Sequence, residues 1–319
     1  MKNWKPILTY LLSAVLVLSL SGCVNQHPEE SASDSNESAQ GDQQTETRIV
    51  ATSYATLLIC DKLGLDLVAI PTTSSEVPER YQGLPEIGTA MAPDAEAIAL
   101  LEPTDVIGPD TLAETIEPTY EAAGVPYTFI DLQSVEGMYD SIAMLGEKYG
   151  VQEAADALID EYETTMADFR ASIEGVDAPK VLILMGLPGA YISCTPNSYA
   201  GSLVELAGAT NVVQVDTNEN FVSWNTEELL KLDPDVILLT AHGLPEEAME
   251  RFAKEFATND VWKNFRAVQE NHVYQLDYTL FGMSCTFDWP EALEVLQEIL
   301  YDHTYEAYDA EAAYNENNS

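Results

Sequence analysis

The chain has 319 residues, of which 13 are Lys or Arg and 54 are Asp or Glu, and its formal net charge is −41 at pH 7. Such a charge repels phosphates, which excludes nucleic acid as a partner and argues against binding to an anionic lipid surface by charge alone. Between two polar ends lie about 260 residues, more than one compact core usually takes, so two lobes are expected.

The first 22 residues are predicted to be a lipoprotein signal peptide. Lys2 and Lys5 precede an apolar run over residues 7–20 that is short for a membrane span. The run leads through Ser21 and Gly22 into Cys23, the pattern of a lipobox, whose cysteine is lipidated and becomes the first mature residue. We therefore expect an extracytoplasmic protein that acyl chains on Cys23 hold at the cell membrane.

Two acidic segments flank the central part of the chain. Residues 23–47 contain no Lys or Arg and are rich in Glu, Asp, Ser, Gln and Asn. They are predicted to be a flexible tether, because so little apolar surface cannot offset the entropy of ordering. Residues 305–319 are similarly acidic and are predicted to be a tail that frays.

The central part alternates β-branched runs with helical stretches, which is the rhythm of parallel βαβ units. The predicted strands are 48–52, 67–70, 105–107 and 127–130 in the first half, and 180–184, 235–239 and 272–276 in the second. The predicted fold class is therefore α/β, with two Rossmann-like lobes over residues 48–150 and 176–304.

Residues 151–175, between the lobes, are predicted to form one uninterrupted helix. Apolar side chains recur there at spacings of three and four residues, which makes one apolar stripe. At about 1.5 Å per residue the helix spans roughly 37 Å, enough to bridge two lobes. A stiff connection of this kind permits little hinge closure, and it predicts a receptor that holds its ligand in a cleft between the lobes.

The two halves share a local pattern. A short helix opens at Glu96 and is ended by Pro103 before a strand, and Glu227 and Pro234 take the same positions in the second half. Any helix-to-strand turn resembles this pattern to some degree. The glutamate, leucine and proline positions all coincide, however, which favours an internal duplication.

The ligand site of such a fold is expected where strands end and helices begin. Four stretches qualify, and they are residues 51–54, residues 88–94, residues 186–191 with 199–202, and residues 241–243. The first of them leads into a helix whose free backbone amides favour an anion.

Two side chains in these stretches can bind iron. His242 stands in a strand-to-helix loop of the second half, and Met91 takes a matched position in the first half. Taken singly, such a histidine is more often structural and such a methionine more often belongs to a core. As a pair, an imidazole and a thioether suit the axial positions of haem iron, whereas zinc and manganese prefer several imidazoles, thiolates or carboxylates.

Three cysteines follow the lipobox. Cys60 lies in an apolar helical run and is predicted to belong to the core. Cys194 and Cys285 fall in predicted loops of the second half, where they can form a disulfide outside the cell or remain free.

Residues 48–301 resemble the helical-backbone class of ABC substrate-binding proteins, whose members carry iron-siderophores, cobalamin or haem. Within that class they are most similar to the haem-receptor lipoproteins of the iron-regulated surface determinant systems of Gram-positive bacteria. The matching stretches include residues 49–53, 61–67, 78–81, 83–85, 91–94, 185–189, 198–199, 206–208, 242–247, 254–256, 259–263, 273–274 and 281–282. The stretch around His242 is the most specific of them.

The resemblance implies that Met91 and His242 are the axial ligands of haem iron, one from each lobe. It also implies that Glu96 and Glu227 are surface acids that dock onto arginines of an ABC permease, which works with its ATPase. Surface proteins that bind haem upstream are further implied partners, and the implied location is a Gram-positive cell surface.

The chain departs from these relatives near residues 72–80, where they carry lysines and this chain has only Arg80 to meet haem propionates. The amides at the strand ends are therefore expected to take a larger part in binding the propionates. The predicted haem and propionate environment consists of Thr52, Ser53, Tyr54, Arg80, Tyr191, Ser198 and Tyr199.

Other functions fit the sequence less well. A receptor of the same class for an iron-siderophore or cobalamin would explain the fold and make Met91 and His242 incidental. An enzyme is not expected, because the sequence has no Gly-x-Ser-x-Gly, His-Glu-x-x-His or P-loop pattern. A structural adhesin has no positive support in the sequence.

Overall fold

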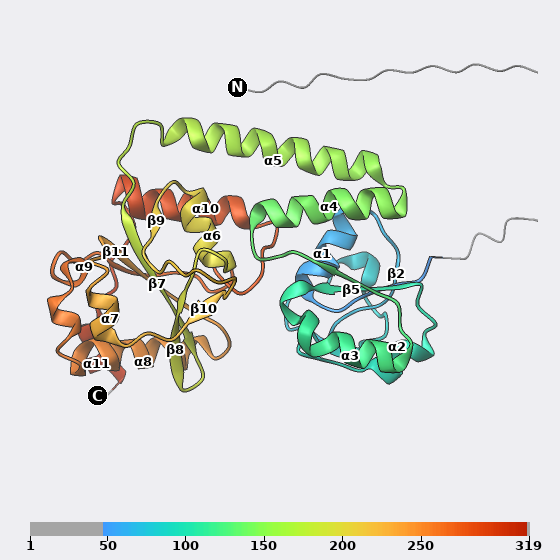
Figure 1. Ribbon diagram of the computed structural model, residues 1–319, viewed down its shortest axis with the longest axis horizontal. Coiled ribbons are helices and arrows are strands. Elements are labelled where there is room, and N and C mark those ends of the chain that lie inside the picture. The colour runs from blue at the N-terminus through green and yellow to red at the C-terminus, as the bar shows by residue number, and fades with distance from the viewer. Residues whose placement is uncertain (1–46, 318–319) are drawn as a thin grey trace, which may run out of the picture. The chain divides into compact units, whose positions relative to one another are not determined.

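The computed structural model describes residues 47–317 (Figure 1). The predicted signal peptide, the predicted lipidation site Cys23 and nearly all of the predicted tether lie outside the described residues. Within these residues the fold is α/β with two lobes, as predicted.

The N-terminal lobe is built on a four-stranded sheet in which all neighbours are parallel, in the order β2-β1-β5-β6. Its strands are β1 Ile49–Ala51, β2 Leu67–Ala69, β5 Asp105–Pro109 and β6 Tyr127–Ile130. Its helices are α1 Tyr54–Lys62, α2 Ala95–Leu100, α3 Ala113–Ala123 and α4 Val135–Tyr149, with short 3-10 turns at Glu79–Tyr81 and Asp110–Leu112. A small antiparallel hairpin, β3 Gly88–Thr89 with β4 Ala92–Pro93, stands apart from this sheet.

The C-terminal lobe has a mixed sheet in the order β10-β8-β7-β11-β12, with β9 paired to β7. Its strands are β7 Lys180–Leu187, β8 Ala190–Cys194, β9 Thr210–Asn211, β10 Phe221–Val222, β11 Val236–Ala241 and β12 Val273–Gln275. Its helices are α6 Tyr199–Leu206, α7 Thr226–Leu230, α8 Pro245–Thr258, α9 Arg266–Gln269, α10 Trp289–Gln297 and α11 Ala310–Asn317, with a 3-10 turn at Trp262–Asn264 and a π turn at Glu298–Asp302. The antiparallel strands β8 and β10 were not among the predicted strands.

The helix predicted over residues 151–175 is α5, Gln152–Ser172. It packs against α4 and then passes to the C-terminal lobe, where β7 begins (Figure 1). The helix ends a few residues early, at Ile173, and Gly175 follows with a φ of 81°, a left-handed conformation that glycine adopts readily.

Contacts between the two lobes form one continuous apolar core beside α4 and α10. The Trp289 indole donates to the Tyr139 hydroxyl at 3.2 Å, and the Tyr162 ring of α5 stacks on Tyr139. The Cys285 amide donates to the Leu132 carbonyl at 2.8 Å. These contacts tie the C-terminal lobe to α4.

The predicted fraying of residues 305–319 is wrong for the residues that the structure describes. Tyr308 donates its amide to the Val273 carbonyl at 2.7 Å and its hydroxyl to the Met249 carbonyl at 3.2 Å. Helix α11 then packs against α8. Apolar contacts of Tyr308 and Ala310 with the core of the C-terminal lobe outweigh the acidic composition of this segment.

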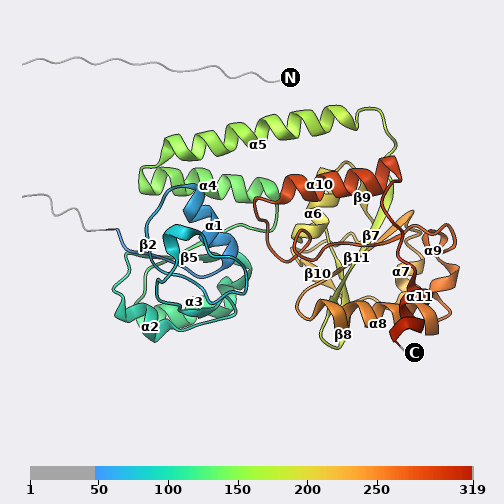
Figure 2. The same cartoon turned by 180° about the vertical axis from the view of Figure 1, so that it is seen from behind.

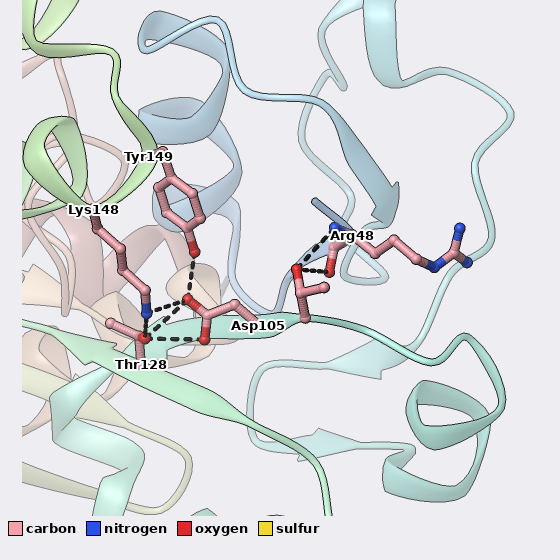
Figure 3. A network of polar contacts seen from close by, with 6 residues as sticks. Arg48, Asp105, Thr128, Lys148 and Tyr149 are labelled. Atoms are coloured by element: carbon pink, nitrogen blue, oxygen red, sulfur yellow. Dashed lines mark hydrogen bonds and ion pairs between the residues drawn. The ribbon is translucent and has the colours of Figure 1, made fainter. Parts of the chain in front are cut away.

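A buried polar network fixes the end of α4 to the sheet of the N-terminal lobe (Figure 3). The Asp105 side chain, at the start of β5, accepts hydrogen bonds from the Thr128 hydroxyl at 2.9 Å and from the Tyr149 hydroxyl. It also pairs with the Lys148 ammonium at 2.6 Å. Because the network lies at the amino end of β5, it is separate from the carboxyl ends of the strands, where the ligand site is predicted.

Candidate ligand-binding site

The first strand leads directly into a capped helix at the predicted site. The Thr52 amide donates to the Ile107 carbonyl at 3.0 Å, which extends the pairing of β1 with β5. Ser53 is the N-cap of α1, and its hydroxyl accepts from the Thr56 amide at 3.1 Å. The Tyr54 hydroxyl donates to the Glu76 carbonyl at 3.2 Å. The side chains of Thr52 and Ser53 therefore serve the local fold, and the amides at the start of α1 are the groups suited to an anion.

Met91 lies in the turn between β3 and β4, and 69% of its surface is exposed. The hairpin is held beyond the carboxyl end of β2, because the Thr72 amide donates to the Gly88 carbonyl at 2.8 Å. A side chain at Gly88 would meet the Ala92 carbonyl oxygen at 2.6 Å, and its φ of 88° also requires glycine. The hairpin thus presents a thioether that no core of the lobe uses.

His242 follows the last residue of β11, and its amide donates to the Gly186 carbonyl at 2.9 Å at the end of β7. The imidazole is accessible to solvent, yet partial desolvation by the surrounding protein lowers its pKa from the usual value. A lowered pKa keeps the ring neutral, which is the form that binds a metal. Gly243 and Leu244 both have positive φ values, 68° and 45°, so the loop turns sharply straight after this histidine.

Glu96 and Glu227 are both exposed in the first turns of short helices, α2 and α7. Each helix begins with a side-chain cap: Asp94 accepts from the Ala97 amide, and Asn225 accepts from the Glu228 amide. The two glutamates therefore occupy equivalent positions in the two lobes.

Arg80 and Tyr191, two of the residues predicted to contact the propionates, have other partners in the structure. The Arg80 guanidinium pairs with Asp66 at 2.7 Å and donates to the Gly64 carbonyl. Both partners follow the C-terminal end of α1, whereas Ser53 is at its N-terminal end. Tyr191 lies in β8, and its ring packs near Phe252 and Trp262 in the core of the C-terminal lobe. Both side chains have partners within their own lobe, and their part in binding propionates stays a prediction.

Ser198 and Tyr199 are also committed to the fold. The Ser198 hydroxyl caps α6 and donates to the Thr195 carbonyl at 2.7 Å. Tyr199 is 2% exposed, and its phenol contacts the Cys285 thiol. Both side chains are buried, and their part in the haem environment stays a prediction.

The disulfide between Cys194 and Cys285 is not formed. Both are free and buried thiols, and Cys194 lies beside the Ser198 hydroxyl. Burial raises the pKa of Cys194 to about 12 and raises that of Cys285 well above its usual value. The thiols therefore behave as small core side chains, like Cys60, rather than as loop residues that can pair.

Several residues at strand ends were missed in the sequence. A cavity of about 360 Å³ is shared by the lobes and is lined by Asp131, Gln133, Ser134, Pro196, Asn197, Asn218 and Asn220. Burial, and then the neighbouring Asp131 carboxylate, raise the pKa of Asp110, which follows β5. The exposed apolar side chains Leu244 and Tyr278 follow β11 and β12. The strand-end rule that selected His242 would also have found Asp110, Asp131, Leu244 and Tyr278, whereas the residues from the loops around β8 and β10 could not be found in this way.

Residues 49–280 match the family model of periplasmic binding proteins. The chain belongs to this family. This periplasmic binding protein is 38% identical over 301 residues to the high-affinity heme uptake system protein IsdE of Staphylococcus aureus strain Newman, which covers 92% of this chain and 98% of the relative.

Two solved structures extend the similarity to the fold. An ABC transporter substrate-binding protein from Listeria monocytogenes EGD-e is 40% identical, with a TM-score of 0.76 over 81% of this chain and 99% of that chain. S. aureus IsdE complexed with heme is also 40% identical, with a TM-score of 0.76 over 80% of this chain and 99% of that chain.

Family membership confirms a two-lobe extracytoplasmic binding protein that serves transport and is not an enzyme. Within residues 47–317, no helix combines the length and the apolar character that a membrane span requires.

Proposed function

We propose that this periplasmic binding protein captures haem outside the cell and delivers it to an ABC importer for iron acquisition. The observation that carries the proposal is the match to 99% of a relative whose structure was determined with heme bound. The exposed thioether and the exposed, neutral imidazole at the strand ends of the two lobes support it.

In this proposal Met91 and His242 bind the two axial positions of the haem iron. Each side chain is exposed, and each stands on a loop or hairpin whose backbone is fixed by a hydrogen bond to the neighbouring strand or loop. Such sites are prepared for a ligand, because the iron would not have to displace a core contact.

The haem propionates are assigned to the start of α1. The helix has free backbone amides after the Ser53 cap, and no acid lies in its first turn. Tyr54 lies beside these amides. Arg80 is left out of this proposal because its guanidinium is held by Asp66.

The remaining parts of the proposal concern the membrane. Cys23 carries the lipid anchor, and Glu96 and Glu227 contact basic residues of the permease, one from each lobe. Two exposed acids at equivalent helix starts support a partner with two basic patches.

Parallel titrations of the purified chain with haem, a ferric siderophore and cobalamin test the function. We expect haem to saturate at one molecule per chain, with a low-spin six-coordinate absorption spectrum, and the other two ligands to bind weakly. Tight binding of the siderophore or of cobalamin without binding of haem would overturn the haem assignment and leave the receptor fold intact.

A further inference from the structure

The two helices that carry Glu96 and Glu227 belong to segments with closely similar local geometry. Three pairs of residues stand at the same spacing in the two segments. They are the N-caps Asp94 and Asn225, the fully buried side chains Ile98 and Leu229, and the turn residues Glu102 and Asp233. Glu102 and Asp233 have φ values of 48° and 47°, which few residues other than glycine adopt. The same backbone path therefore occurs once in each lobe.

One position in this repeated path differs sharply in chemistry. Leu100 in the N-terminal lobe corresponds to Lys231 in the C-terminal lobe, and both side chains are exposed. Leu100 is 85% exposed, the highest value among the large apolar side chains that the structure describes as exposed. A leucine so exposed contributes little to the core of its own lobe, and the other lobe has a lysine at the same position.

Leu100 shares a helix face with the proposed docking acid. It lies four residues after Glu96 on α2, which places the two side chains one above the other. Helix α2 lies on the side of the N-terminal lobe away from α5 in both views (Figures 1 and 2).

The predicted membrane tether joins the chain next to the same helix. The tether leads into Arg48, whose guanidinium donates to the Leu101 carbonyl at 2.8 and 3.0 Å. The end of α2 is therefore fixed beside Arg48, the residue that follows the predicted tether.

We propose that Leu100 inserts into an apolar socket of the permease, next to the basic patch that receives Glu96. The proposal rests on the proposed function. The partner surface that fits is apolar at its centre and basic at its edge, because Leu100 stands between two exposed acids, Glu96 and Glu102. The same acids disfavour insertion into an anionic lipid surface. In the C-terminal lobe Lys231 takes the equivalent position, so the two halves of the docking surface present different chemistry.

Substitution by the residue of the other lobe tests this contact. In cells that carry the natural permease and use haem as the iron source, Leu100→Lys is expected to lower haem uptake about tenfold, the size of effect typical of a central interface contact. The matched control is Val176→Lys, which places the same charge at a half-exposed apolar position between α5 and β7. Both purified variants are expected to keep the haem spectrum of the natural chain.

A photo-crosslinking experiment identifies what Leu100 touches. Cys60, Cys194 and Cys285 are buried and Cys23 is expected to carry the lipid, so Leu100→Cys in the lipidated protein can be labelled selectively with a maleimide that carries a benzophenone. Crosslinks to the permease support the proposal, whereas crosslinks to lipid alone would overturn it.

Equal uptake by Leu100→Lys and Val176→Lys would also overturn it. If a combined Glu96→Ala, Glu227→Ala variant keeps full uptake, the docking proposal itself fails, and that outcome is distinct from failure at Leu100 alone.

Discussion

His242 combines solvent access with a lowered pKa, and this combination suits an iron ligand. The loops around it remove part of the water that would stabilise the imidazolium, so the neutral ring persists to lower pH than on an open surface. No carboxylate partner is needed to keep the ring available. The chain turns sharply at Gly243 and Leu244 before the following helix begins.

The lowered pKa predicts how haem binding depends on pH. Iron binds the neutral imidazole, so ligation by His242 is at full strength above the pKa of the ring and weakens as the pH falls below it, where the proton competes with iron. We expect the low-spin spectrum to persist below about pH 6.5, where an ordinary histidine is half protonated. A pH titration of the haem complex, followed by visible absorption, measures this. Loss of the signal with a midpoint above that pH would contradict the account, and His242→Ala should show no such transition.

Residue type and strand position together predict that Met91 and His242 are exposed at strand ends, which the structure shows, but they do not predict the direction of the side chains around them. A strand-end position tells where a backbone lies, whereas the direction of a side chain depends on partners far away in the sequence. The Arg80 guanidinium forms an ion pair with Asp66, and the Tyr199 phenol contacts the Cys285 thiol. Neither partner was visible in the local pattern.

At the scale of elements, the parallel strands and the long helix were predictable because each carries its own apolar period. The hairpin of β7 and β8 was not, because its turn at Gly189 was assigned to a ligand loop. Helix α11 was missed because its composition is polar, and it is held by two hydrogen bonds of Tyr308 and by packing on α8. Local composition cannot report such tertiary contacts.

The network of Asp105 predicts a large effect on stability without an effect on ligand binding. Asp105→Ala removes the acceptor of Tyr149 and the partner of Lys148 in a buried position, and should lower the free energy of unfolding by about 2–4 kcal/mol. The haem spectrum should not change, because the network is at the amino end of β5.

Urea unfolding of the purified variants provides the measurement. The control is Asp260→Ala, which removes the exposed partner of Lys263 and should leave the unfolding midpoint where it was. A changed haem spectrum in Asp105→Ala with unchanged stability would argue against a purely structural role for this network.

At the scale of the whole molecule, the two lobes share one apolar core across α4, α5 and α10. A shared core couples the lobes, so they should unfold together and move little relative to each other. The division into two lobes was predictable from chain length and the repeated strand pattern. The extent of the contact between them was not, because Trp289 and Tyr139 are 150 residues apart.

Trp289→Ala tests this coupling. The indole is 2% exposed and touches both Tyr139 and Tyr162, so its loss should cost about 3–5 kcal/mol in unfolding free energy. In calorimetry we expect the single transition of the natural chain to separate into two. Trp224→Ala, whose indole packs only within the C-terminal lobe, is the control and should lower the midpoint without separating the transitions.

The assignment of the iron ligands is the central claim, and the absorption spectrum of the haem complex tests it most directly. Met91→Ala and His242→Ala should each remove one axial ligand and convert the low-spin six-coordinate spectrum to a high-spin or five-coordinate one. Met144→Ala and His272→Ala, which alter an exposed methionine and a surface histidine on other elements, should leave the spectrum as it was. A natural spectrum in both Met91→Ala and His242→Ala would contradict the account.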